Sequence, residues 1–164
     1  MSIQVKLIGV NHKIQHGHPE EETDEKIGTV RKFAAYLKDV VNTYNISMLA
    51  EEFNRERCEA NHVAYSTVQA IADELKIVHL FCEPSSTEKQ KEGIRKTDAD
   101  YDEKRELFWL KKLMDNTNPS MKVVFVCGYK HLDTFKAKLE TSGIRTEILS
   151  RGWGDNLPEF IPPF

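Results

Sequence analysis

The chain has 164 residues and a formal net charge of -3 at pH 7, a size that fits one domain able to bury its own core. The slightly acidic balance gives no basic footprint for nucleic acid, so we expect no nucleic-acid partner. The longest apolar runs are strand-sized and the amino terminus lacks a signal-peptide pattern, which predicts a cytoplasmic protein with no membrane partner.

Predicted strands and helices alternate along the chain. Apolar β-branched runs predict strands at 3–10, 46–50, 77–82, 122–127 and 145–149. Apolar residues at helical spacing predict helices at 25–44, 63–75, 99–114 and 131–141, and Gly143 fits the residue just past the last helix. The polar stretches 11–23 and 85–98 are predicted to be loops.

This order predicts an α/β fold. Strands that alternate with helices at this spacing favour right-handed crossovers, and hence a mostly parallel sheet of about five strands with helices on both faces. We expect a single three-layer domain over residues 1–150. Residues 151–164 contain three prolines and Trp153, and we interpret them as a C-terminal tail that lies on the surface or on a neighbour, which offers a route to a homo-oligomer.

Three cysteines, Cys58, Cys82 and Cys127, do not suggest a disulfide framework. Their number is odd and no Cys-x-x-Cys spacing is present. Two of them lie in apolar strand-like runs, so we expect buried thiols in a reducing compartment.

Two strand ends carry the same motif. The first predicted strand ends in Gly9-Val-Asn-His12 and the fourth ends in Gly128-Tyr-Lys-His131. A glycine lets the backbone bend as it leaves the sheet, and the histidine three residues later can point back over the strand end, where open parallel sheets bind ligands. Either histidine alone is well explained as a turn or helix-cap residue; as a pair they favour a shared site.

Carboxylates follow the second and third strands. Glu51 and Glu52 end one strand, with Arg55 close behind, and Glu83 ends the next. The simplest interpretation is that these carboxylates are solvated at the strand ends and have no further role. Because side chains alternate along a strand, one of the two adjacent glutamates should face the site, and we expect it to be Glu52.

Further along, Arg105 and Glu106 lie on the helix at 99–114. On position alone, Arg105 belongs to a solvated face and has no special role. His16 and His18 could form a metal cluster with His12, but we favour the interpretation of a flexible loop that happens to contain histidines.

The order of these pieces resembles the superfamily of TraB, Tiki, ChaN and erythromycin-esterase-like proteins. Its members are similar in having Gly-x-x-His after the first strand, a glutamate after the second, an arginine followed by an acidic or amide residue on a later helix, and a second Gly-x-x-His. The resemblance spans residues 3–149. It departs at Glu106, where aspartate or asparagine is commoner, and the chain is short for the family, so the substrate class does not carry over.

The resemblance implies a hydrolase. In the Tiki branch it implies a Mn- or Co-type metalloprotease, and in the esterase branch a histidine that acts as general base on water. Carried over, His12 and His131 would be metal ligands or bases, Glu52 a ligand or acid/base, and Arg105 a clamp for an oxyanion or carboxylate.

We accordingly expect His12, Glu52, His131 and Arg105 to be catalytic, with substrate contacts from Glu51, Arg55 and Glu106. Imidazole and carboxylate together suit either a divalent metal such as Mn, Co or Zn, bound by His12, Glu52 and His131, or an acid and base pair without a metal. No nucleotide cofactor is predicted, and the residues do not distinguish a small-molecule from a peptide substrate. The alternative is a non-catalytic module that recognises a small anion or a protein at the same sheet edge.

Overall fold

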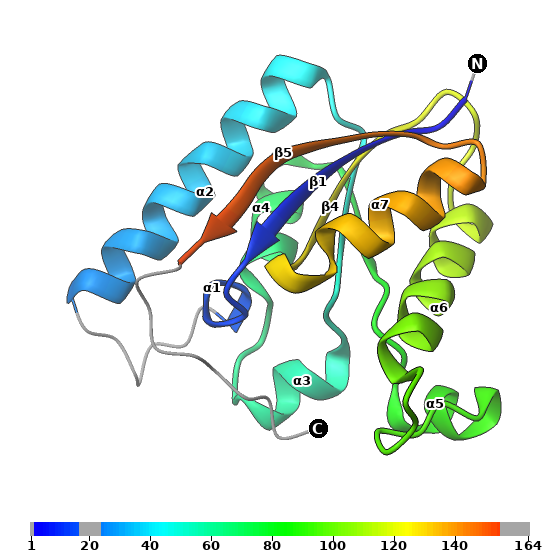
Figure 1. Ribbon diagram of the computed structural model, residues 1–164. Coiled ribbons are helices and arrows are strands. Elements are labelled where there is room, and N and C mark those ends of the chain that lie inside the picture. The colour runs from blue at the N-terminus through cyan, green and yellow to red at the C-terminus, as the bar shows by residue number, and fades with distance from the viewer. Residues whose placement is uncertain (1, 17–23, 155–164) are drawn as a thin grey trace.

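The five predicted strands form one sheet in the computed structural model, which describes residues 2–16 and 24–154 (Figure 1). The strand order is β3-β2-β4-β1-β5, and every pairing is parallel. The predicted α/β class is therefore confirmed. The strands are β1 (Gln4–Val10), β2 (Met48–Glu51), β3 (Val78–Phe81), β4 (Lys122–Gly128) and β5 (Arg145–Trp153). The helices are α1 (Lys13–His16), α2 (Asp24–Tyr44), α3 (Arg55–Ala60), α4 (Thr67–Leu75), α5 (Ser86–Glu92), α6 (Tyr101–Asp115), the 3₁₀ turn η2 (Tyr129–His131) and α7 (Leu132–Thr141).

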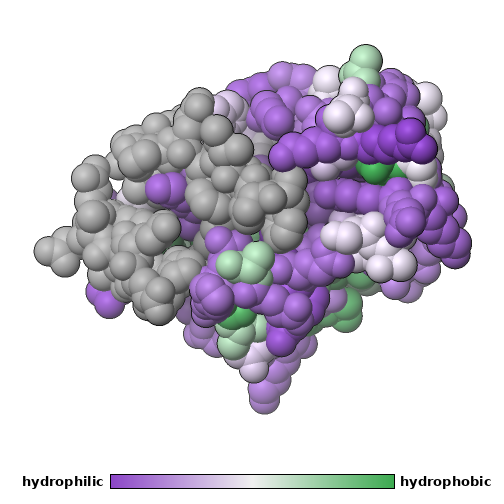
Figure 2. Space-filling model, turned by 90° about the horizontal axis from the view of Figure 1, so that it is seen from below, coloured by the Kyte–Doolittle hydropathy of each residue, from purple (hydrophilic) through white to green (hydrophobic). Residues whose placement is uncertain are grey.

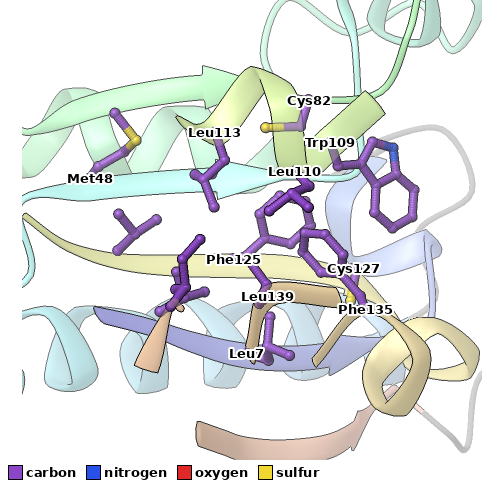
Figure 3. Packing of buried hydrophobic residues seen from close by; sticks show 14 of the residues in the cluster. Leu7, Met48, Cys82, Trp109, Leu110, Leu113, Phe125, Cys127, Phe135 and Leu139 are labelled. Carbon is purple, nitrogen blue, oxygen red and sulfur yellow. The ribbon is translucent and has the colours of Figure 1, made fainter. Parts of the chain in front are cut away.

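Helices cover both faces of the sheet, which makes the three layers that the alternation predicts (Figure 1). One face packs against α2 and α4 through buried residues that include Phe33, Leu37 and Val68. The other face packs against α6 and α7 (Figure 3). Its cluster contains Leu7, Met48, Cys82, Trp109, Leu110, Leu113, Phe125, Cys127, Phe135 and Leu139.

Aromatic packing anchors α6 and α7 to the central strand β4. Trp109 lies 5.8 Å from Phe125 and 5.4 Å from Phe135, measured between ring centroids, and the last pair meets edge to face. All three side chains are fully buried. Because each such side chain removes a large apolar area from water, this contact fixes α6 and the start of α7 relative to the strand ends.

The long loop predicted at 85–98 is partly wrong, because it contains α5. Ser85 accepts a hydrogen bond from the Glu88 backbone N–H, and the Glu88 side chain accepts one from the Ser85 N–H. This reciprocal capping box starts the helix, and Gly93 ends it with φ of 67°. The short helices α1 and α3 also fall in stretches where no helix was predicted.

The last strand is longer than predicted. β5 continues to Trp153, three residues into the stretch assigned to the tail, because the indole packs against Tyr36 at 5.0 Å and against Phe33 at 5.8 Å. Gly143 follows α7 with φ of 78°, as predicted. The remainder of the predicted tail, 155–164, and His18 lie outside the described residues.

Two further expectations concern the whole chain. Within residues 2–16 and 24–154, no helix is both long and apolar enough to cross a bilayer. The three cysteines are free and buried, as expected.

Candidate functional site

The candidate site lies at the carboxyl ends of β1, β4 and β2, which are neighbours in that order. His12 follows β1, Glu52 follows β2, and Gly128 ends β4 between them. His131 lies one 3₁₀ turn beyond Gly128. The strand order thus brings together side chains from both ends of the chain, as the topology argument predicted.

Glu52 is the centre of the site. Its carboxylate is 1% exposed. One oxygen, Oε1, accepts a hydrogen bond from the Gly128 N–H at 2.8 Å, and the other, Oε2, accepts one from Arg105 Nη2 at 2.5 Å. Burial works to raise the pKa of Glu52, but its electrostatic interactions, those with His12 and Arg105 foremost, outweigh burial and hold that pKa well below its usual value. Glu52 is therefore ionised in the folded protein.

His12 faces Glu52 with one ring nitrogen and Gln15 with the other. His12 Nε2 lies 3.7 Å from Glu52 Oε1, and Nδ1 lies 2.9 Å from Gln15 Oε1. Burial lowers the pKa of His12, the charges of Arg57 and Arg105 lower it further, and Glu52 opposes them. The imidazole is therefore neutral at pH 7. The His12 side chain is 15% exposed, so it can be reached from solvent.

His131 faces a carboxylate with each ring nitrogen. Nδ1 lies 2.8 Å from Glu106 Oε2, and Nε2 lies 3.7 Å from Glu52 Oε2. Thr134 and Lys138 also donate to Glu106, at 3.0 Å and 3.2 Å, which holds that carboxylate in place. His131 is 1% exposed, and its Nε2 is buried without a hydrogen-bond partner. A buried polar atom left in this state marks a place where a small polar group can bind.

Arg105 binds carboxylates of its own chain. Its Nε donates to both oxygens of Glu83, at 2.9 Å and 3.2 Å, Nη2 donates to Glu83 and Glu52, and Nη1 donates to Asp102 at 3.0 Å. Its guanidinium carbon lies 5.2 Å from the ring centroids of Tyr101 and Trp109. Burial works to lower the pKa of Arg105, but the carboxylates raise it well above its usual value. The guanidinium is thus directed at Glu52 and Glu83 and holds the ends of β2 and β3 to α6.

The glycines of the two motifs are required by space. A Cβ added to Gly128 would lie 2.8 Å from His12 Nε2 and 3.4 Å from Glu52 Oε1. A Cβ added to Gly9 would lie 2.6 Å from Leu132 Cδ1 and 3.1 Å from Tyr129 Cα. Each glycine therefore makes room for residues that follow the glycine of the other motif. Gly128 itself has φ of -56°, so close approach rather than an unusual backbone conformation explains it.

Glu51 and Glu52 point to opposite faces of the sheet, as alternation requires. Glu51 is 0% exposed and accepts hydrogen bonds from Gln15 Nε2 at 2.9 Å, from His79 Nε2 at 2.8 Å and from the Ser66 hydroxyl. His79 on β3 therefore has a hydrogen-bond partner. Glu51 does not contact His12 directly but reaches it through Gln15.

Arg55 lies apart from the other predicted residues. Its side chain is exposed and donates to the Ala64 carbonyl at 2.7 Å. Asn54 caps α3 by accepting from the Arg57 N–H, and this start places Arg57, 4% exposed, in the interior instead. The sequence offered no signal to choose between the two arginines. It also gave none for Gln15, whose role depends on a contact with residues after another strand.

The cluster does not fit a divalent cation as it stands. Among the residues that the structure describes, no group of three or more His, Cys, Asp or Glu side chains is arranged to hold a metal ion. Glu52 already accepts from Arg105 and from Gly128, and the charge of Arg105 would repel an added cation. His12, Glu52 and His131 could ligate a metal only if Arg105 moved away from Glu52.

The three cysteines do not supply a reactive thiol. Burial raises the pKa of the Cys58 thiol to about 11 and raises those of Cys82 and Cys127 as well. The thiolate is the nucleophilic form, so these residues stay unreactive at neutral pH. The chemistry of this edge of the sheet is therefore that of imidazole and carboxylate.

Figure 2 views the molecule from below, onto the end where α3 and α5 lie, beyond the carboxyl ends of the strands. Outside the grey residues, most of the visible surface is hydrophilic, with small apolar patches. Comparison with models of protein families, with curated proteins and with solved structures found no match.

Proposed function

We propose that this protein is a hydrolase in which His12 activates a water molecule beside Glu52. One observation carries the proposal: two histidine Nε2 atoms each lie 3.7 Å from one oxygen of the same buried carboxylate. That distance is too long for a direct hydrogen bond, so neither Nε2 atom is bonded to Glu52 and each can take a water molecule as its partner. The Gly-x-x-His motifs and their resemblance to the esterase-like superfamily support the same chemistry.

The side chains have distinct roles in this proposal. Neutral His12 accepts the proton of the attacking water, and Glu52 orients that water and stabilises the imidazolium that forms. His131 lies between Glu52 and Glu106, so two carboxylates adjoin any positive charge that develops on its ring during the reaction. It would donate to the leaving group. Arg105 holds Glu52 in place, and its role as a substrate clamp would need it to exchange a carboxylate of the chain for one of the substrate.

A metal-dependent version is the alternative form of this proposal. It requires Arg105 to leave Glu52, so that Glu52 and the two histidines can bind Mn, Co or Zn. Metal analysis of protein purified without a histidine tag decides between the forms. If wild type contains one equivalent of metal and His12→Gln contains none, the metal-dependent form holds and the metal-free form is wrong.

The test of hydrolysis is a comparison of matched histidine variants. Wild type would be assayed on chromogenic carboxylic esters and on a mixed peptide library, because the substrate is not identified. General acid or base catalysis is worth about 10²–10⁴ in rate, so His12→Gln and His131→Gln should each lose at least about a hundredfold. His62→Gln is the control, since His62 is exposed and outside the site. Equal activity in folded His12→Gln, His131→Gln and wild type would refute the proposal.

A second candidate is a non-catalytic module that binds a small anion or a protein at the same edge. The observation in its favour is burial, because Glu52 and His131 are each 1% exposed and only His12 among the three reaches solvent. Calorimetry with acetate, phosphate and a peptide library would detect binding. Saturable binding that His12→Gln abolishes, without turnover of any ester or peptide, would favour the module over the enzyme.

We further propose that the protein works in the cytoplasm. Three free, buried cysteines suit a reducing compartment. Localisation of a tagged chain in cells would test this. Light scattering of a chain cut after Gly154, which leaves β5 whole, would test the homo-oligomer that the predicted tail suggests.

A further inference from the structure

Behind His12 lies a second buried carboxylate, Glu51, which the proposed mechanism does not use. Its three hydrogen-bond donors are Gln15, Ser66 and His79. Only Gln15 also contacts His12. Gln15 is 0% exposed, so its amide is a rigid link between Glu51 and the imidazole.

The partners of Gln15 determine which way its amide points. One end of the amide faces two acceptors, Glu51 Oε2 at 2.9 Å and the Glu52 backbone carbonyl at 3.4 Å. Neither can donate a hydrogen, so the NH₂ group must occupy this end. The amide oxygen is then left facing His12 Nδ1, at 2.9 Å.

We propose that Gln15 is a positioning residue that holds His12 with its hydrogen on Nδ1. The Gln15 oxygen can only accept, so Nδ1 must donate, and the lone pair of neutral His12 is on Nε2, toward Glu52. Glu51 acts at one remove because it fixes the Gln15 amide. The catalytic meaning rests on the proposed function, in which His12 Nε2 receives the proton; the tautomer itself is a property of the folded chain.

The two Gly-x-x-His histidines are thereby made unequal. The Nδ1 of His131 faces the carboxylate of Glu106, whereas the Nδ1 of His12 faces a neutral amide. Glu51 does not contact His12, because the Gln15 side chain lies between them. The charged groups that act on His12 are Glu52 after β2, Arg57 on α3 and Arg105 on α6.

Two variants of Gln15 test the inference through ring-nitrogen NMR of His12, with signals assigned by their loss in His12→Gln. Wild type should show hydrogen on Nδ1. Gln15→Met keeps the length of the side chain but removes the acceptor, so we expect the Nε2–H tautomer to appear. The double variant Gln15→Glu with Glu51→Gln exchanges charge and amide and restores an acceptor. It should return the hydrogen to Nδ1 and raise the His12 pKa by about one to three pH units, since a carboxylate now adjoins the ring.

The inference is overturned if the wild-type ring carries its hydrogen on Nε2, or if folded Gln15→Met keeps it on Nδ1. Should Gln15→Met fail to fold, the double variant decides alone: an unchanged His12 pKa overturns the inference. These readouts need no turnover. An inactive protein with the expected tautomer would refute the hydrolase and leave the positioning role of Gln15 intact.

Discussion

Gly128→Ala is the substitution that would press directly on His12. The new Cβ would lie 2.8 Å from His12 Nε2 and 3.2 Å from His12 Cε1. Carbon makes favourable contact only from about 3.5 Å, so the ring must retreat by roughly 0.7 Å from the new Cβ. Overpacking of this kind costs about 1–3 kcal/mol of unfolding free energy. A displacement near 1 Å costs about a hundredfold in rate where the reacting groups must be aligned.

The assay is urea denaturation, with turnover measured on whichever ester or peptide wild type hydrolyses. Gly28→Ala is the matched control, because no atom lies within 4 Å of the added Cβ and Gly28 is inside α2. Alanine is favoured over glycine in a helix by about 1 kcal/mol, so the control should be more stable than wild type. The reasoning about the motif glycines is refuted if Gly128→Ala is as stable as Gly28→Ala and leaves the His12 NMR signals unchanged.

Two other predictions concern charge. Arg105→Met leaves Glu52 and Glu83 buried without their main partner, and we expect urea denaturation to show a loss of about 3–5 kcal/mol in the free energy of unfolding. The control is Arg55→Met, at an exposed position, which should change that free energy by less than about 0.5 kcal/mol. Similar values for both variants would contradict the role of Arg105 in holding the two carboxylates. The free energy of unfolding should fall on acidification. Unfolded His12 takes up a proton near its ordinary pKa of 6.5, whereas folded His12, whose pKa is lowered, does not. The free energy of unfolding therefore decreases from pH 6.5 downward until the folded imidazole titrates. Glu52, whose folded pKa is also lowered, extends this loss below pH 4.5. Single-site linkage allows at most about 1.4 kcal/mol per pH unit, and denaturation at pH 7.5 and 5.5 should show a smaller loss in His12→Gln than in wild type; equal losses would show that His12 is not buried in its neutral form.

The sheet and the centre of the site could be predicted because both depend on simple patterns. Apolar runs that alternate with helical stretches fix parallel strands, and parallel strands end at one edge. That argument alone brings His12, Glu52 and His131 together. The helix α5 was also readable in principle, since Ser85 and Glu88 have capping-box spacing, but the surrounding charge concealed it.

The remaining contacts could not be predicted, for physical reasons. Gln15, on α1, acts through an amide whose direction depends on Glu51, a residue on β2. The choice between Arg55 and Arg57 depends on where α3 begins, and a shift of one residue would turn a different side chain inward. The motif glycines are needed because each lies close to residues that follow the other strand. The spacing within either motif gives no information about that distance.

The position of β4 has a consequence for the order in which the protein matures. β4 lies between β1 and β2, so His12 and Glu52 belong to strands that are not neighbours until β4 is in place. During synthesis both strands leave the ribosome long before Lys122, yet they have no common edge on which a site could form. β4 therefore joins β1 to β2, supplies the Gly128 N–H to Glu52 and leaves the space for His12 in a single step. A chain made only as far as β3 would carry His12 and Glu52 without the strand that brings them together.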